Sequence, residues 1–161
     1  MIITETRKED LKQIMDIVEE SRVFLRNNGV DQWQGPYPLV EDFENDIKNG
    51  NAYVVKEGDE VLAMFAVIGH DNNYDYIEDG KWLDESDYIA IHRVGVKYKG
   101  RGICGFIFEE MKKRYDHIRV DTHADNIPMN TCIRKHGFKY CGVVYMEDHS
   151  PRNAYEYMKE I

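Results

Sequence analysis

Apolar residues early in the chain recur with the spacing of amphipathic helices. Across residues 9–27 the apolar positions, mostly three or four apart, are Leu11, Ile14, Met15, Val18 and Leu25. Such spacing gives a helix one apolar face, and Asn28-Gly29 predicts its end, because glycine readily adopts the left-handed conformation that closes helices. A strand at residues 2–6 is expected before this helix, and a loop over residues 31–38 and a short helix at residues 40–48 after it.

The middle of the chain changes to the pattern of strands. Residues 52–56 and 61–69 are mainly apolar, and the turn residues Glu57-Gly58-Asp59 between them predict a β-hairpin. A polar and aromatic segment without regular spacing, residues 71–86, follows and is expected to be a loop. Loops of this length are uncommon in compact domains and often carry function.

Strand and helix patterns alternate over the rest of the chain. Strands are expected at residues 87–96, 118–122, 138–147 and 153–160, and helices at residues 102–114 and 128–136. Pro128 in the first turn and Gly137 after the end support the second of these helices. The whole order of elements predicts a mixed α/β fold.

The composition is that of an ordinary folded domain. The 161 residues suffice for one core, and we expect a single domain over residues 1–161. No apolar run approaches the ~20 residues of a membrane span, and the first residues lack the apolar core of a signal peptide, so we expect a cytoplasmic protein with no membrane partner. The net charge of −9 argues against a nucleic-acid partner, whereas a cationic acceptor such as an amine would be attracted.

The cysteines and histidines do not form a metal-binding pattern. The cysteines, Cys104, Cys132 and Cys141, are odd in number and contain no C-x-x-C pair, which is typical of reduced, structural thiols. Asp121-Thr122-His123 holds an aspartate and a histidine that could bind a metal, but strand ends offer many such chance pairs. We therefore expect no metal.

A glycine-rich turn is the strongest chemical signal in the chain. The strand that ends at Val96 is followed by Gly100-Arg101-Gly102-Ile103-Cys104-Gly105 and then by an apolar helical run. Glycines let backbone N–H groups approach a phosphate, and the N-terminus of a helix favours its negative charge. The turn also reads literally as the dinucleotide fingerprint G-x-G-x-x-G, with Asp121 standing where a ribose-binding acid would.

The surroundings of the turn argue against a dinucleotide. Lys97, Tyr98 and Lys99 separate the strand from Gly100, whereas the fingerprint leaves its strand almost directly. The elements before the turn are rich in hairpins and not in β-α-β units. A long ligand with its pyrophosphate on the turn and a thiol arm along the strand explains the pattern better.

The residues around this turn resemble a known family. Val94-Gly95-Val96 followed by residues 99–104, KGRGIC, resembles motif A of the GNAT N-acetyltransferases, (Q/R)-G-x-G-(I/V)-(G/A). Residues 126–138, from Asn126 to Phe138, resemble their motif B, N-x(6)-Tyr-x-x-x-G-F. The resemblance implies an α/β (α+β) fold, with a mixed, mostly antiparallel sheet of about six or seven strands flanked by about four helices. It also implies direct transfer of acetyl from acetyl-CoA to a primary amine of a small molecule or peptide, in a ternary complex.

The sequence departs from the family motifs at three positions. Lys99 replaces the usual Gln or Arg, and Cys104 replaces Gly or Ala. Ile133 stands where the family commonly has the tyrosine that protonates the departing thiolate, and isoleucine cannot donate a proton. A non-catalytic domain that senses acyl-CoA is therefore the alternative function.

The resemblance assigns the coenzyme to motif A and to one asparagine. The main chain of Val94, Gly95 and Val96 would hold the pantetheine arm, orient the thioester and stabilise the oxyanion. The pyrophosphate would lie on the turn formed by Gly100, Arg101, Gly102, Ile103, Cys104 and Gly105. Asn126 would bind the pantetheine arm, cap the helix that follows, or do both.

Two residues are candidates for the base that takes the proton of the amine. His92 lies two residues before Val94 and would share its strand face; a histidine titrates near neutrality and serves at this position in some family members. A carboxylate at the position of Asp121 serves in other members. The alternative is that His92 is a core histidine and Asp121 a solvated acid at a strand end.

The acceptor pocket is expected in the loop after the first helix, where relatives build theirs. Trp33 and Tyr37 lie there and could frame a small amine, or they could pin the loop to the core. The expected partners are a small-molecule or peptide amine, and the sequence leaves open whether the chain forms a homodimer.

Overall fold

The computed structural model describes residues 1–160. In this part of the chain the helices are α1 (Leu11–Asn27), α2 (Val40–Lys48), α3 (Ile103–Arg114) and α4 (Ile127–Lys135), with short 3-10 helices η1 (Lys8–Asp10) and η2 (Asn72–Tyr74). The strands are β1 (Ile2–Glu5), β2 (Ala52–Glu57), β3 (Glu60–Ile68), β4 (Ile89–Val96), β5 (His117–Thr122), β6 (Lys139–Tyr145) and β7 (Pro151–Met158). Each predicted helix and strand is present, within a few residues of its expected ends.

The strands form one mixed sheet in the order β1-β2-β3-β4-β5-β7-β6. The pairs β1–β2, β2–β3, β5–β7 and β6–β7 are antiparallel, and β4 runs parallel to β5 where Ile89 to Ile91 pair with Ile118 to Val120. The expected α+β fold with a mostly antiparallel sheet of about six or seven strands and about four helices is confirmed for the described residues.

The chain forms two compact units, which we describe separately. The first unit comprises Met1–Val67 and His92–Cys104, and the second comprises Ile68–Ile91 and the chain from Gly105 onward. Strand β4 and helix α3 each begin in one unit and end in the other. The single domain over residues 1–161 stays a prediction.

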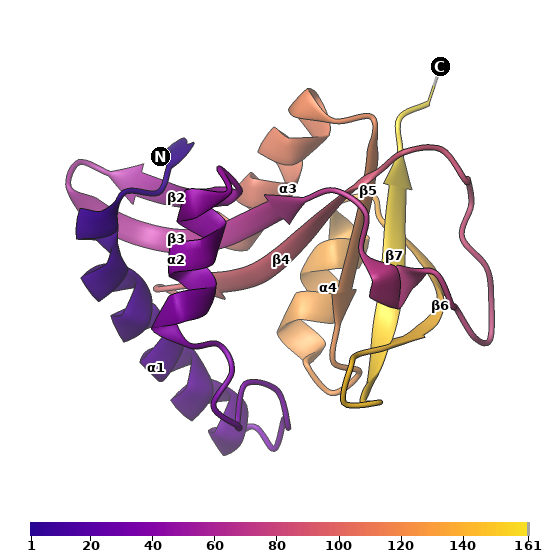
Figure 1. Ribbon diagram of the computed structural model, residues 1–161, viewed down its shortest axis with the longest axis horizontal. Helices are drawn as coiled ribbons and strands as arrows, with labels where there is room; N and C mark the ends of the chain where they lie inside the picture. The colour runs from indigo at the N-terminus through magenta and orange to yellow at the C-terminus, as the bar shows by residue number, and fades with distance from the viewer. Residues whose placement is uncertain (161) are drawn as a thin grey trace. The chain divides into compact units, whose positions relative to one another are not determined.

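The core of the first unit lies between its helices and the β2–β3 hairpin. Helices α1 and α2 lie close together in this unit (Figure 1). The buried cluster consists of Ile14, Ile17, Val18, Phe43, Val54, Val61 and Met64. The apolar stripe predicted for the first helix is thus the face of α1 that packs on the sheet, and burial of each large side chain stabilises the unit by about 1.5–3 kcal/mol.

The core of the second unit takes in part of the segment that the sequence predicts to be a loop. The buried residues Tyr74 and Trp82 come from this segment and pack with side chains from β4, β6 and β7. Glu78 forms an isolated β-bridge with Val143, with both backbone hydrogen bonds 2.8 Å long. The prediction of an irregular loop over residues 71–86 therefore missed η2 and this bridge, because aromatic side chains anchor the segment in the core.

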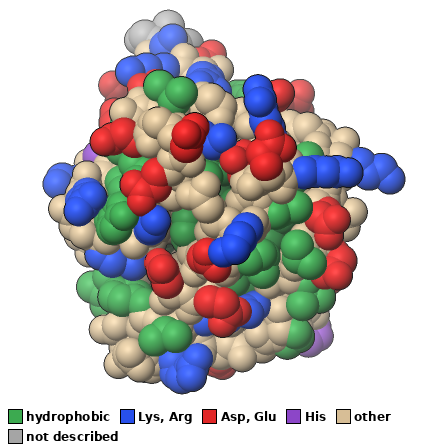
Figure 2. All heavy atoms as spheres, turned by 90° about the vertical axis from the view of Figure 1, so that its left-hand side faces the viewer, with side chains coloured by type: hydrophobic (Ala, Val, Ile, Leu, Met, Phe, Trp, Pro, Cys, Tyr) green, Lys and Arg blue, Asp and Glu red, His purple; other side chains and the backbone are tan. Residues whose placement is uncertain are grey.

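The surface mixes both signs of charge. On the face in Figure 2, the described Lys and Arg side chains stand among Asp and Glu side chains and form no continuous basic area. Within residues 1–160 no helix combines the length and apolar character needed to cross a bilayer.

Candidate active site

Strand β4 contains one residue with an unusual backbone conformation in the middle of the motif. Arg93 has a φ of 52°, in the left-handed region that few residues other than glycine adopt. Sequence reasoning placed His92 and Val94 on one strand face by simple alternation. Alternation requires extended backbone at every residue between the two positions, and the φ of Arg93 is not that of extended backbone, so the shared face stays a prediction.

The side chain of Arg93 is held on both sides within the first unit. Its Nε and second terminal nitrogen donate to the two carboxylate oxygens of Asp46 at 2.7 and 2.6 Å, and its first terminal nitrogen donates to Tyr37 Oη at 3.0 Å. Burial lowers the pKa of the Arg93 guanidinium, but its bonds to Asp46 and Tyr37 outweigh this effect, so the pKa is raised. These bonds keep the unusual backbone conformation of Arg93 in place.

Gly95 lies in close contact with core side chains of the first unit. A Cβ atom built on it would lie 2.3 Å from Met64 Cε and 3.2 Å from Ile17 Cγ2, so a side chain at this position would require Met64 to move. Val94 and Val96 on either side are half-buried, as is His92.

The glycine turn has the backbone that an anion site requires. Gly100 and Gly102 have φ angles of 77° and 72°, and nothing lies within 4 Å of a Cβ atom built on either. The two glycines are therefore explained by backbone conformation and not by crowding. Arg101 stacks on the Tyr98 ring at 4.1 Å, and Ile103 begins α3 directly afterwards. Backbone N–H groups before a helix N-terminus are suited to a phosphate.

Gly105 differs from the other glycines of the motif. It lies inside α3 and belongs to the second unit, where a Cβ atom would lie 2.3 Å from His136 Nε2. His136 is held in turn by Glu109, whose carboxylate lies 2.8 Å from its Nδ1. The close approach of α3 to this histidine explains the absence of a side chain at Gly105.

The acceptor loop, residues 31–38, is held by one arginine from α1. Arg22 donates to the backbone carbonyls of Trp33, Pro36 and Pro38 at 3.1, 2.9 and 2.8 Å. Trp33 is half-buried and packs on the core cluster of the first unit, so it does pin the loop to the core. Tyr37 is 46% exposed. Sequence reasoning missed Arg22, and nothing in the helical pattern marks it.

In the second unit, Asp121 has a partner that the sequence did not reveal. Tyr74 Oη donates a hydrogen bond to Asp121 Oδ2 at 2.5 Å. Tyr74 is buried in η2, and Asp121 is half-buried near the end of β5. Burial raises the pKa of Tyr74 well above its usual value, and the negative charge of Asp121 raises it further.

The start of α4 gives Asn126 a structural role. Its side-chain oxygen accepts a hydrogen bond from the Met129 backbone N–H at 3.3 Å, as an N-cap does. This agrees with one of the two roles considered for it. Ile133 on the same helix is fully buried, so the position of the family's acid is filled by a core side chain.

Metal ligands do not gather in the described structure. Within residues 1–160 no group of three His, Cys, Asp or Glu side chains could hold an ion. His123 near Asp121 instead uses its Nδ1 to accept the backbone N–H of Asp125 at 3.0 Å.

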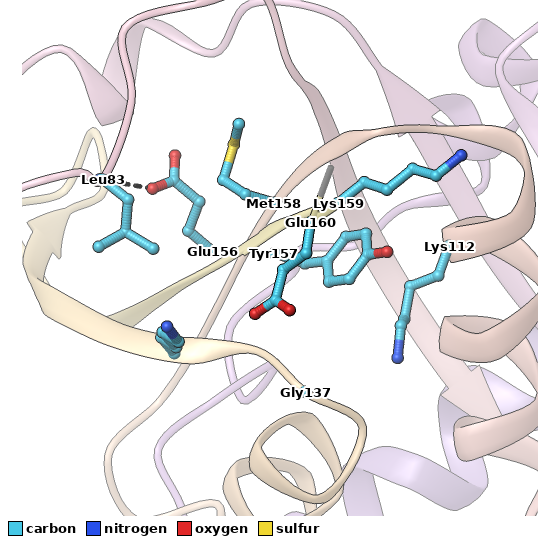
Figure 3. Close-up of a pocket in the computed structure, with 9 residues that line it drawn as sticks. Leu83, Lys112, Gly137, Glu156, Tyr157, Met158, Lys159 and Glu160 are labelled. Atoms are coloured by element: carbon cyan, nitrogen blue, oxygen red, sulfur yellow. Dashed lines mark hydrogen bonds between the residues drawn. The ribbon is translucent and has the colours of Figure 1, made fainter.

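A pocket of about 460 Å³ in the second unit is unrelated to the predicted site (Figure 3). Lys112, Tyr157 and Lys159 are among its lining residues, and the described lining includes none of the candidate catalytic, coenzyme-binding or acceptor-binding residues. Lys112 is already bonded to Glu109 and to the carbonyl of His136, at 3.1 and 2.9 Å. We assign this pocket no part in the chemistry.

Comparison with known proteins shows the family of the chain. No family model matches the chain. A GNAT-family acetyltransferase from Streptococcus agalactiae 2603 has a solved structure similar to this one, with a TM-score of 0.93 and 34% identity over 99% of this chain and 96% of that chain. The chain belongs to the GNAT family of acetyltransferases.

Further relatives agree with this assignment. YesJ of Bacillus subtilis strain 168, described as an uncharacterized N-acetyltransferase, is 25% identical over 149 residues, which cover 83% of this chain and 79% of YesJ. The structure of AAC(6')-Ib in complex with paromomycin and acetyl-CoA shares the fold alone, at 16% identity and a TM-score of 0.67 over 97% of this chain and 92% of that one. The GNAT protein described here is an acetyl-CoA-dependent N-acetyltransferase, as motifs A and B predict.

Proposed function

We propose that this enzyme transfers the acetyl group of acetyl-CoA directly to a primary amine of a small molecule or peptide, within a ternary complex. The observation that carries the proposal is the open turn with Gly100 and Gly102 in left-handed conformations before α3. A solved protein of the same fold holds acetyl-CoA together with a second small molecule, which supports a ternary complex here.

In this proposal the first unit supplies most of the coenzyme contacts. The backbone N–H groups from Gly100 to Cys104 bind the pyrophosphate, while the main chain of Val94 and Val96 holds the pantetheine arm and the thioester carbonyl. Gly95 and Gly105 act through close packing of their backbones. Asn126 contributes at least by capping α4, whose first turn follows it.

The reaction needs one base and no covalent enzyme intermediate. The amine nitrogen attacks the thioester carbonyl carbon, the C–N bond forms, and the C–S bond breaks with departure of the coenzyme A thiolate. The proton lost by the amine passes to the base, directly or through water. His92 on β4 and Asp121 on β5 are the candidates. Because Ile133 is a core residue, the thiolate departs without the family's tyrosine.

The acceptor loop is the proposed source of specificity. Arg22 fixes its backbone, Trp33 anchors it to the core, and Tyr37 presents an exposed ring. A loop with one exposed aromatic side chain and several polar groups suits a small polar amine, for which the aromatic ring supplies apolar contact or cation–π attraction.

Turnover with a panel of primary amines, measured as release of free coenzyme A thiol, tests the proposal. We expect saturable thiol release with at least one small amine or peptide N-terminus, with His92→Ala or Asp121→Asn lowering kcat by roughly 10²–10³. Acetyl-CoA should raise the melting temperature, and NADH should not. Stabilisation by acetyl-CoA without turnover on any amine would favour the acyl-CoA sensor instead.

A further inference from the structure

Tyr74 and Asp121 meet although they are far apart in sequence. Tyr74 comes from η2, within the segment of residues 69–88 that we call the Tyr74 loop, and Asp121 comes from β5. The phenol donates to one carboxylate oxygen at 2.5 Å. Tyr74 is only 1% exposed, so its hydroxyl does not face bulk solvent.

The Tyr74 loop is built to hold this phenol. Trp82 Nε1 donates to the carbonyl of Tyr74 at 2.8 Å, and the two rings pack with their centroids 5.3 Å apart. The ring centroids of Tyr88 and Tyr74 lie 6.1 Å apart, and the Tyr88 hydroxyl accepts a hydrogen bond from the backbone N–H of Asp71 at 2.9 Å. The aromatic contacts and the hydrogen bonds fix the ring and the backbone of Tyr74 together.

A buried ionic cluster anchors the loop to β5 and β7. Arg119 Cζ lies 4.1 Å from the ring centroids of both Trp82 and Tyr88. Arg119 Nε donates a hydrogen bond to the Glu156 carboxylate at 2.7 Å. Glu156 is fully buried, and its other carboxylate oxygen accepts the backbone N–H of Leu83 at 2.6 Å (Figure 3).

His117 completes this cluster on the other side of Glu156. Its Nε2 lies 2.5 Å from the carboxylate, and its Nδ1 lies 3.1 Å from both the Asp87 carbonyl and Ser86 Oγ. Arg119 also donates to the carbonyl of Asp84 at 2.7 Å. The part of the loop that leads into β4 is thus held at four residues, Leu83, Asp84, Ser86 and Asp87.

We propose that Tyr74 is a positioning residue for acetyl transfer, which holds the carboxylate of Asp121 in the orientation that accepts the proton of the acceptor amine. The inference rests on the proposed function, and within it on Asp121 rather than His92 as the base. A carboxylate that must take a proton within hydrogen-bond reach of the amine benefits from a fixed orientation. One charge-assisted bond from a rigid phenol provides this orientation.

The ionisation of Tyr74 fits this role. Burial and the negative charge of Asp121 raise its pKa well above the usual value for tyrosine. The phenol therefore keeps its proton throughout the pH range in which acetyltransferases are assayed, and it acts there as a permanent donor. Tyr74 is not the missing acid for the thiolate in this account, because its proton stays between the phenol and Asp121.

A double-mutant cycle on the intact enzyme tests the inference. Tyr74→Phe removes the hydroxyl and keeps the ring, and we expect kcat to fall about ten-fold, as for the loss of a hydrogen bond to a charged group, with the KM for acetyl-CoA unchanged. In the Asp121→Asn background the same substitution should have no further effect on kcat, because Tyr74 acts through Asp121. The enzyme with Tyr74 should thus have a higher kcat than the enzyme with Tyr74→Phe only when Asp121 is present.

Tyr155→Phe is the matched control. Tyr155 is also fully buried in the second unit, and its hydroxyl donates to Asn130 at 2.6 Å and not to Asp121. We expect a loss of stability similar to that of Tyr74→Phe, without the loss in kcat. An equal fall of kcat in both variants would overturn the inference, because it would show a merely structural effect.

The remaining outcomes separate this inference from the proposed function. If Asp121→Asn lowers kcat and Tyr74→Phe does not, the inference is wrong and the role of Asp121 stands. If Tyr74→Phe lowers kcat equally in both backgrounds, the inference is also wrong. If Asp121→Asn keeps full kcat, the base is not Asp121, and the inference fails with that assignment.

Spectra of the tyrosines keep the inference testable if Tyr74→Phe does not fold. Asp121→Asn removes the charged carboxylate to which the Tyr74 hydroxyl donates. With 13C-labelled tyrosine at neutral pH, the Tyr74 resonance should therefore differ between Asp121→Asn and the wild type, and the Tyr155 resonance should stay the same. Identical Tyr74 resonances in the two proteins would show that the phenol does not contact Asp121.

Discussion

The acceptor loop of the first unit and the Tyr74 loop of the second are held in different ways. The backbone of the acceptor loop is held by hydrogen bonds from Arg22, and Trp33 is its contact with the core cluster. The Tyr74 loop is held by buried aromatic rings and by the ionic cluster around Glu156. A loop that is held mainly through its backbone carbonyls can vary in most side chains at little cost to the core, whereas one whose own side chains form the core cannot.

This difference matches the tasks that we propose for the two loops. The acceptor loop contacts the variable substrate, and the Tyr74 loop positions a group that every turnover requires. Loops that carry specificity are commonly surface segments on a rigid scaffold. Catalytic groups need supporting contacts that hold their geometry within a fraction of an ångström. Substitutions at the two kinds of anchor should therefore differ in size and in the property that they change.

The largest effect is expected from Glu156→Ala. The substitution leaves the buried side chains of Arg119 and His117 without their carboxylate. Breaking a buried ion pair by removal of one partner costs about 3–5 kcal/mol, so urea unfolding should show a loss of this size. Glu109→Ala is the control, because Glu109 also pairs with a lysine and a histidine but is 48% exposed; its loss should stay below about 1 kcal/mol. Equal losses would remove the contrast between buried and surface anchors.

The second-largest effect is expected from Gly102→Asp, which should lower the affinity for acetyl-CoA. An aspartate there places negative charge where the pyrophosphate would meet the N-terminus of α3. We expect the affinity for acetyl-CoA to fall at least about 100-fold, or about 2.7 kcal/mol, in titration calorimetry.

Gly58→Asp is the control for this variant. Gly58 in the β2–β3 turn has a φ of 60° and nothing within 4 Å of a built Cβ atom. The backbone strain is therefore similar, and the affinity for acetyl-CoA should be unchanged. A folded Gly102→Asp protein with undiminished affinity would show that the turn does not bind the coenzyme.

Most of the fold could be predicted because its signals are local. Apolar spacing located the helix that became α1, and Gly58 located the turn of the β2–β3 hairpin. The glycine turn before α3 was also predictable, since Gly100 and Gly102 are required by their own backbone angles. The unusual backbone conformation of Arg93 was not predictable, because Asp46, which binds its side chain, is 47 residues away.

The contacts that hold the site escaped prediction for the same reason. Tyr74 and Asp121 are 47 residues apart, and Leu83 and Glu156 are 73 apart. No periodicity along the chain links such positions. Gly95 was assigned to the coenzyme from its motif, and only its distance to Met64 shows that a larger residue there would also displace a core side chain.

A moderate effect is expected from Arg22→Ala. It removes three hydrogen bonds from a charged donor to carbonyls of the acceptor loop, and we expect a loss of about 1–2 kcal/mol of stability. The KM for the acceptor amine should rise about five- to ten-fold, while the affinity for acetyl-CoA stays constant. Arg26→Ala, an exposed arginine on the same helix, should change neither quantity. A higher KM for acetyl-CoA alone would contradict the assignment of this loop to the acceptor.

The smallest effect is expected from Tyr37→Phe, which separates the phenol of the acceptor loop from its ring. The phenol accepts one hydrogen bond from Arg93, at 3.0 Å, but Arg93 keeps both of its bonds to Asp46. Loss of one such bond should cost less than about 1 kcal/mol and change the KM for the acceptor less than about three-fold. Tyr37→Ala, which also removes the exposed ring, should raise this KM further, because the ring would supply the contact with the amine. If Tyr37→Phe weakened acceptor binding as much as Tyr37→Ala, the hydroxyl and not the ring would recognise the acceptor. The hydroxyl of Tyr37, fixed by Arg93, would then be a positioned polar group of the acceptor loop, as the hydroxyl of Tyr74 is in the other loop.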